Sequence, residues 1–180
     1  LFTVCLHHFL GSDLERIYDE LGKRFPEICF VRCFMDPIMR KSGLTPDQKL
    51  RLSMYDPLKK GTVTEEGQRR ISILGSDFAL DETSDLKRLL RCNDYQIKES
   101  PVCESWEDYL SLSDCRMMLN CYPSGKAGTE WAAERLGRPF MYMPSCFDYD
   151  EIIGQLEALS ESMELLGVLD YEGEKESCEA

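Results

Sequence analysis

The chain has 180 residues, of which 43% are hydrophobic and 30% are charged, and its formal net charge is −12. A chain of this length can bury a core of its own, and it corresponds to one domain or to one domain and part of a second. No apolar run approaches the roughly 18 residues that a membrane span needs. Lys and Arg are dispersed rather than clustered, which argues against nucleic acid or an anionic membrane surface as a partner.

The cysteine content favours a reducing compartment. There are nine cysteines, an odd number, and they lack the dense spacing of a small disulfide-stapled secreted domain. We therefore predict a cytoplasmic protein. No Cys-x-x-Cys pair occurs, so a zinc ribbon or a thioredoxin-type site is not supported. Because the sequence starts at Leu1 with a strand-like run, we expect it to be a fragment of a longer chain.

Residues 1–62 predict a partial α/β module, the C-terminal part of a first domain. Apolar runs indicate strands at 2–6 and 28–34, and helical spacing indicates a helix at 14–21 between them. Thr45-Pro46-Asp47 is typical of a helix start, and apolar residues continue the helical pattern to Leu58. The polar stretch that follows carries no periodicity and predicts a module boundary.

Residues 69–168 predict a Rossmann-like α/β domain. Strands are expected at 71–74, 95–97, 117–120 and 140–143, and they alternate with helices expected at 84–91, 105–112, 124–136 and 149–166. Single helices between strands imply crossover connections, hence a layered parallel sheet with helices on both faces. The acidic, aperiodic segment 169–180 is expected to be a disordered tail.

Motifs for phosphate binding and for nucleophilic hydrolysis are incomplete. Ser124-Gly125-Lys126 lies between a strand and a helix, but the upstream Gly of a P-loop is missing and Ala127 replaces the metal-binding hydroxyl. Neither G-x-G-x-x-G nor G-x-S-x-G occurs. The two histidines, His7 and His8, are adjacent and better explained as surface or subunit-interface residues.

Cysteines at the ends of predicted strands are the remaining candidates. Cys121 follows the strand at 117–120, and Cys33 ends the strand at 28–34. Ligands of open parallel sheets bind outside the carboxyl ends of the strands. The helix expected to start at Ser124 should lower the pKa of the Cys121 thiol and suit a soft metal such as iron. The alternative is that Cys121 is a small apolar core residue.

Several segments resemble the middle domain of the nitrogenase component 1 family. This family includes molybdenum–iron protein subunits, cofactor-assembly scaffolds and dark-operative protochlorophyllide reductases. The similar segments are Arg-Met-Met-Leu-Asn-Cys-Tyr-Pro-Ser at 116–124, Glu-Arg-Leu-Gly-Arg-Pro-Phe at 134–140, Met-Pro at 143–144, and the strand and helix at 71–75 and 85–90. The resemblance covers roughly residues 9–159.

This resemblance implies specific roles. Cys121, Tyr122 and Ser124 match a Cys-Tyr-Arg-Ser segment that presents a cofactor cysteine, with Pro123 in place of the Arg, and Cys33 lies near the place of a bridging-cluster cysteine. The implied function is that of an anaerobic oxidoreductase subunit domain that contributes to a metal-cluster or tetrapyrrole cavity, with an iron–sulfur or other iron-containing cluster. The implied partners are a homologous paired subunit and an ATP-dependent iron protein, and the fragment alone is expected to be inactive.

Two other functions stay open. One is a non-catalytic scaffold or binding module that holds a metal cluster, a tetrapyrrole or a small anionic ligand at the strand ends. The other is a purely structural domain at a subunit interface.

Overall fold

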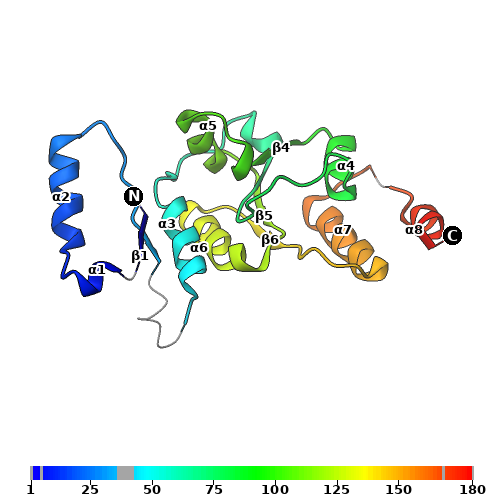
Figure 1. Cartoon of the computed structure of the whole chain (residues 1–180). Coiled ribbons are helices and arrows are strands. Elements are labelled where there is room, and N and C mark those ends of the chain that lie inside the picture. The colour runs from blue at the N-terminus through cyan, green and yellow to red at the C-terminus, as the bar shows by residue number, and fades with distance from the viewer. Residues whose placement is uncertain (1, 5, 36–42, 168, 180) are drawn as a thin grey trace.

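The computed structural model describes residues 2–4, 6–35, 43–167 and 169–179, and its main feature is a four-stranded sheet with helices on both sides (Figure 1). The strands of this sheet run in the order β4-β3-β5-β6, and every pair is parallel. Their bounds are β3 (Arg70–Ile73), β4 (Gln96–Glu99), β5 (Met117–Asn120) and β6 (Phe140–Tyr142). The predicted α/β fold with a parallel sheet is confirmed.

Some helices of the described chain alternate with these strands, and the others precede or follow them. The α-helices are α1 (Leu6–Phe9), α2 (Leu14–Arg24), α3 (Pro46–Tyr55), α4 (Asp85–Cys92), α5 (Trp106–Leu110), α6 (Lys126–Leu136), α7 (Tyr149–Met163) and α8 (Tyr171–Glu179). Short 3-10 turns occur at η2 (Gly67–Arg69), η3 (Ser100–Val102), η4 (Ser111–Ser113) and η5 (Pro123–Gly125). Thr45 starts α3 as predicted, because its hydroxyl accepts from the Gln48 N–H while the Gln48 side chain accepts from the Thr45 N–H.

Successive side chains of β3 and β5 point to opposite faces of the sheet and so belong to two separate cores. On one face, Ile71, Ile73 and Leu119 pack with α4 and α7. On the other face, Leu74 and Met118 pack with residues of α3, α5 and α6. The domain is therefore three layers thick, and it matters for function which face a side chain occupies.

The chain leaves the two central strands in opposite directions. After β3 it runs to α4, and after β5 it runs to α6 on the other face. Gly75, with φ +86°, and Gly125 touch at this point, since a Cβ on Gly75 would lie 2.7 Å from the Gly125 Cα and 2.3 Å from the Asn120 Nδ2. Asn120 is fully buried, and its amide donates to the Leu74 carbonyl over 2.7 Å. No side chain larger than hydrogen fits at either glycine.

Helix α3 packs directly on α6, although the predicted module boundary lies between α3 and β3 (Figure 1). Gly128 permits this contact, because a Cβ there would lie 3.2 Å from the Leu52 backbone nitrogen. Arg51 of α3 is buried and donates to the Gly75 carbonyl (3.0 Å) and to the Asp77 carboxylate (2.9 Å). The N-terminal part is thus tied to the strand ends of the main sheet.

The N-terminal strands are shorter than expected. Strands β1 (Phe2–Val4) and β2 (Cys33–Met35) form a separate parallel pair, and β2 packs against α3. The predicted strand at 28–34 is wrong over most of its length, because the Ile28 N–H turns back to donate to the Phe25 carbonyl. Among the described residues, strand pairing begins only at Cys33.

The C-terminal segment is also different from the expectation of a disordered tail. Residues Tyr171–Glu179 form α8, and Tyr171 packs against the core shared by α4 and α7. The Asp170 carboxylate accepts from the Gly173 N–H (3.1 Å), and Lys175 pairs with Asp150 (2.7 Å). The packing of Tyr171 on the core and the capping of the helix start by Asp170 account for a helix in this acidic sequence.

Within the described ranges, no helix combines the length and the apolar character that crossing a membrane would require.

We expect Gly75→Ala to destabilise the fold by about 3 kcal/mol or more, because the added Cβ meets the Gly125 backbone and the residue has positive φ. Urea unfolding followed by circular dichroism measures this loss. Gly154→Ala is the matched control: this site in α7 has open space around it, so the same change should be neutral or stabilise by up to about 1 kcal/mol. Equal effects of the two substitutions would contradict the close contact between the Gly75 and Gly125 backbones.

Candidate functional site

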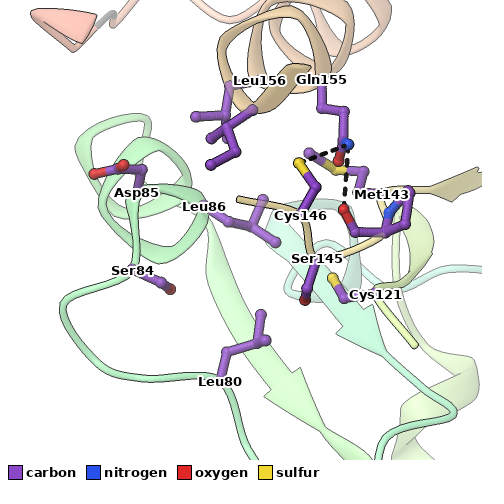
Figure 2. A pocket seen from close by; sticks show the side chains of 12 residues that line it. Leu80, Ser84, Asp85, Leu86, Cys121, Met143, Ser145, Cys146, Gln155 and Leu156 are labelled. Carbon is purple, nitrogen blue, oxygen red and sulfur yellow. Dashed lines mark hydrogen bonds between the residues drawn. The ribbon is translucent and has the colours of Figure 1, made fainter. Parts of the chain in front are cut away.

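A cavity of about 290 Å³ opens at the carboxyl ends of β5 and β6, between α4 and α7 (Figure 2). Three stretches of chain line it: the loop after β3 with the start of α4, the first residue after β5, and the loop after β6 with α7. The lining residues are Leu80, Ser84, Asp85, Leu86, Cys121, Met143, Pro144, Ser145, Cys146, Ile152, Gln155 and Leu156.

The walls of the cavity are mainly apolar. Leu86, Met143 and Leu156 are buried members of the core on this face, and Leu80 and Ile152 pack against it. Ile152 and Leu156 are one helical turn apart, so they present a continuous apolar strip of α7. The cavity is therefore an opening into the edge of a core rather than a polar surface groove.

Polar groups lie at a few defined points of the lining. The Gln155 amide donates to the Pro144 carbonyl (3.2 Å) and, at longer range, to the Cys146 sulfur (3.9 Å), as Figure 2 shows. The Ser145 N–H donates to the Cys121 carbonyl (3.3 Å), which ties the loop after β6 to the residue that follows β5. The loop after β6 is thereby fixed to both β5 and α7.

A buried ion pair fixes the other loop of the cavity. Lys87 and Glu99 pair with side chains that are only 2% and 6% exposed. The Glu99 carboxylate accepts from the Leu80 N–H (2.7 Å), and the Lys87 ammonium donates to the Leu80 carbonyl (2.8 Å). Both backbone groups of Leu80 are thus held by one ion pair, which keeps its side chain over the cavity.

The charge of Lys87 is well compensated. Burial lowers its pKa, but the ion pairs with Glu82 and Glu99 outweigh burial and raise the pKa above the usual lysine value. Lys87 therefore stays protonated and acts as a fixed cation that positions the loop.

Cys121 lies at the cavity, but the pKa of its thiol is raised, whereas a lowered pKa was expected. It is 7% exposed, and burial, followed by the charge of Glu99, raises the pKa of its thiol to about 11. The predicted lowering by a helix N-terminus is wrong for a geometric reason. Cys121 belongs to the core on the α4 and α7 face, whereas α6 lies on the other face and begins only after the turn η5.

The other predicted site residues lie elsewhere. Tyr122 is half exposed, with its ring centre 5.7 Å from the guanidinium carbon of Arg51. The Ser124 hydroxyl is buried in η5, with no hydrogen-bond partner among the described residues. Cys33 lies in β2, which packs on α3, and burial raises the pKa of its thiol. The structure therefore brings Cys121 alone of these four to the cavity.

Several lining residues were missed by the sequence analysis. Ser84, Cys146 and Gln155 belong to no motif, and Met143 was expected as the end of a strand and within the resemblance, but not as a site residue. Their position in the chain could have indicated the site. Cys121 follows β5 and the segment 143–146 follows β6, and these two strands are parallel neighbours. The residues that follow them therefore meet at one edge of the sheet.

The donor set does not fit an iron cluster held by these residues alone. Cluster assembly needs several converging thiolates. The cavity offers two cysteines, Cys121 and Cys146, and in the part of the chain that the structure describes no three His, Cys, Asp or Glu side chains gather closely enough to hold a metal ion. Further ligands would have to come from outside the described residues.

In comparisons with known proteins, no family model and no curated protein matches this chain. The resemblance to nitrogenase component 1 and the cytoplasmic location therefore stay predictions.

We expect Lys87→Met to cost about 3–5 kcal/mol of stability, because it leaves the Glu99 carboxylate buried without its cation. The measurement is urea unfolding at neutral pH. Arg88→Met is the control, since Arg88 pairs with Asp85 at a partly exposed position and its loss should cost less than about 1 kcal/mol. The double variant Lys87→Met/Glu99→Met should recover much of the loss. A single variant as stable as the control would show that the pair does not hold the loop.

Proposed function

We propose that this domain binds a small, mainly apolar organic molecule in the cavity between α4 and α7. The observation that carries this proposal is an apolar cavity at the carboxyl ends of neighbouring parallel strands, which is where open α/β sheets bind their ligands. Like the binding module that the sequence left open, the proposed function involves no catalysis, but its ligand is an apolar molecule instead of a metal cluster, a tetrapyrrole or a small anion.

The position of the cavity follows from the packing at the strand ends. In most open α/β sheets the ligand lies where the chain leaves two central strands in opposite directions. Here that point is closed by the contact of Gly75 with Gly125 and is covered by Arg51, which reaches Asp77 after β3 and Tyr122 after β5. The space for a ligand is displaced to the α4 and α7 side.

The size and lining of the cavity set the class of molecule. Ligand sites usually measure roughly 300–1,000 Å³, so a cavity of about 290 Å³ suits a small molecule. Burying apolar ligand surface against Leu80, Leu86 and Leu156 contributes about 25 cal/mol per Å². The loops after β3 and after β6 are both held by hydrogen bonds within the protein. Binding therefore costs little conformational entropy for ordering these loops.

Titration of the chain with Nile red, an uncharged dye that fluoresces in apolar surroundings, tests this proposal. We expect saturable binding that weakens at least about tenfold in Ser145→Phe, because the new ring fills the mouth of the cavity. Ser162→Phe is the matched control on an exposed part of α7 that does not line the cavity, and it should bind as the wild type does. Equal affinity in both variants would place dye binding elsewhere.

The nitrogenase-type oxidoreductase is the second proposed function, and one observation favours it. Cys121, the residue that matches the cofactor cysteine of that family, is the one that lines the cavity. In this proposal a paired subunit supplies the remaining ligands of an iron-containing cluster or encloses a tetrapyrrole with this domain, and an ATP-dependent iron protein delivers electrons.

Anaerobic treatment of the full-length chain and its paired subunit with iron and sulfide tests the second proposal. We expect a brown complex whose visible absorbance is lost in Cys121→Ser and retained in Cys29→Ser, because Cys29 is exposed and does not line the cavity. Absorbance that survives Cys121→Ser would remove Cys121 as a ligand.

A further inference from the structure

Charge is almost absent from the cavity lining. Among the described residues that line it, there is no Lys, Arg or His, and the single carboxylate belongs to Asp85. That carboxylate accepts from Arg88 (2.9 Å) and points to the outer side of α4, away from Cys121 and Ser145 (Figure 2). No fixed charge of either sign is therefore directed into the cavity.

This lining disfavours a charged ligand. An ion that leaves water for an apolar site loses hydration that only an opposite charge or several hydrogen bonds can replace. The first turn of α4 does not compensate the lost hydration of an anion, because Asp85 already places a negative charge at that helix end. A cation would find no carboxylate turned toward it, since Asp85 is paired on the outer side.

One hydroxyl of the lining lacks a partner. Ser84 stands at the N-cap of α4, where a serine side chain normally accepts from the backbone N–H two or three residues ahead. Its side chain makes no such bond here. The Ser84 oxygen is buried and has no hydrogen-bond partner among the described residues, and Figure 2 shows it directed toward the Ser145 side of the cavity. A buried hydroxyl without a partner destabilises the protein, and a ligand that forms a hydrogen bond with it removes this cost.

We propose that the cavity selects an uncharged ligand with an apolar body and one hydrogen-bonding group, such as an alcohol, a phenol or an amide, whose polar group meets the Ser84 hydroxyl. This rests on the proposed function and specifies its ligand class. This ligand class differs from the metal clusters, tetrapyrroles and small anionic ligands that the sequence left open.

Four compounds with the same naphthalene body test the selectivity: 2-naphthalenemethanol, 2-methylnaphthalene, 2-naphthoate and 2-naphthylmethylammonium. Equilibrium dialysis at neutral pH gives their dissociation constants for the whole chain. We expect the alcohol to bind tightest, with an advantage of about tenfold over the methyl compound, and both ions to bind more weakly than either neutral compound.

Variants of Ser84 assign the advantage to its hydroxyl. Ser84→Ala should bind the alcohol no more tightly than the methyl compound, whereas Ser84→Thr, which keeps a hydroxyl, should retain the preference for the alcohol. Circular dichroism checks that each variant is folded, and Ser162→Ala is the control outside the cavity.

The outcomes separate the two proposals. Tightest binding by either ion, or an advantage of the alcohol that persists in Ser84→Ala, overturns the ligand class while leaving a binding site in place. Failure of all four compounds and of Nile red to bind overturns the proposed function itself, and the ligand class with it.

Discussion

The contact between the Gly75 and Gly125 backbones, above the buried amide of Asn120, is the constraint on which the functional geometry depends. It joins the exits of the two central strands so closely that no side chain can stand between them. Arg51 then covers the contact from α3. The usual ligand crevice of a parallel sheet is closed as a result, and the space that is left lies toward α4 and α7.

Two ion pairs near the strand ends have different consequences because their carboxylates differ in burial. Arg51 pairs with Asp77, whose side chain is largely exposed, and it links segments of chain across the top of the sheet. Lys87 and Glu99 are both buried, and each also binds a backbone group of Leu80. The second pair therefore specifies the position of one loop, and its charges are neutralised within the core instead of being presented to a ligand.

The sequence predicted the sheet better than it predicted the site. Apolar runs such as Ile71–Leu74 and Met117–Asn120 mark strands buried on both faces, and single helices were expected between strands, so the parallel sheet could be derived. The short strand at Cys33 and helix α8 depend on a backbone turn and on a tertiary contact of Tyr171, which local patterns do not contain.

The chemistry of Cys121 could not be read from its neighbours in the sequence. Position in the chain places it just before a helix, but strand alternation places its sulfur on the face opposite to that helix. Burial then decides the pKa of the thiol. Ser84 and Gln155 come together with Cys121 only through the fold, so no spacing rule could have joined them.

The close fit of Gly128 against α3 also bears on where this protein can be divided. The polar connection between α3 and β3 is the natural place to cut the covalent chain, yet α3 contributes Tyr55 and Arg51 to the structure that follows the cut. A truncated version that starts at residue 69 would uncover the apolar surface of α6 and leave Asp77 without its arginine. A piece that keeps α6 covered and Asp77 paired must therefore include α3, and so begins at Thr45 or earlier, ahead of the linker rather than behind it.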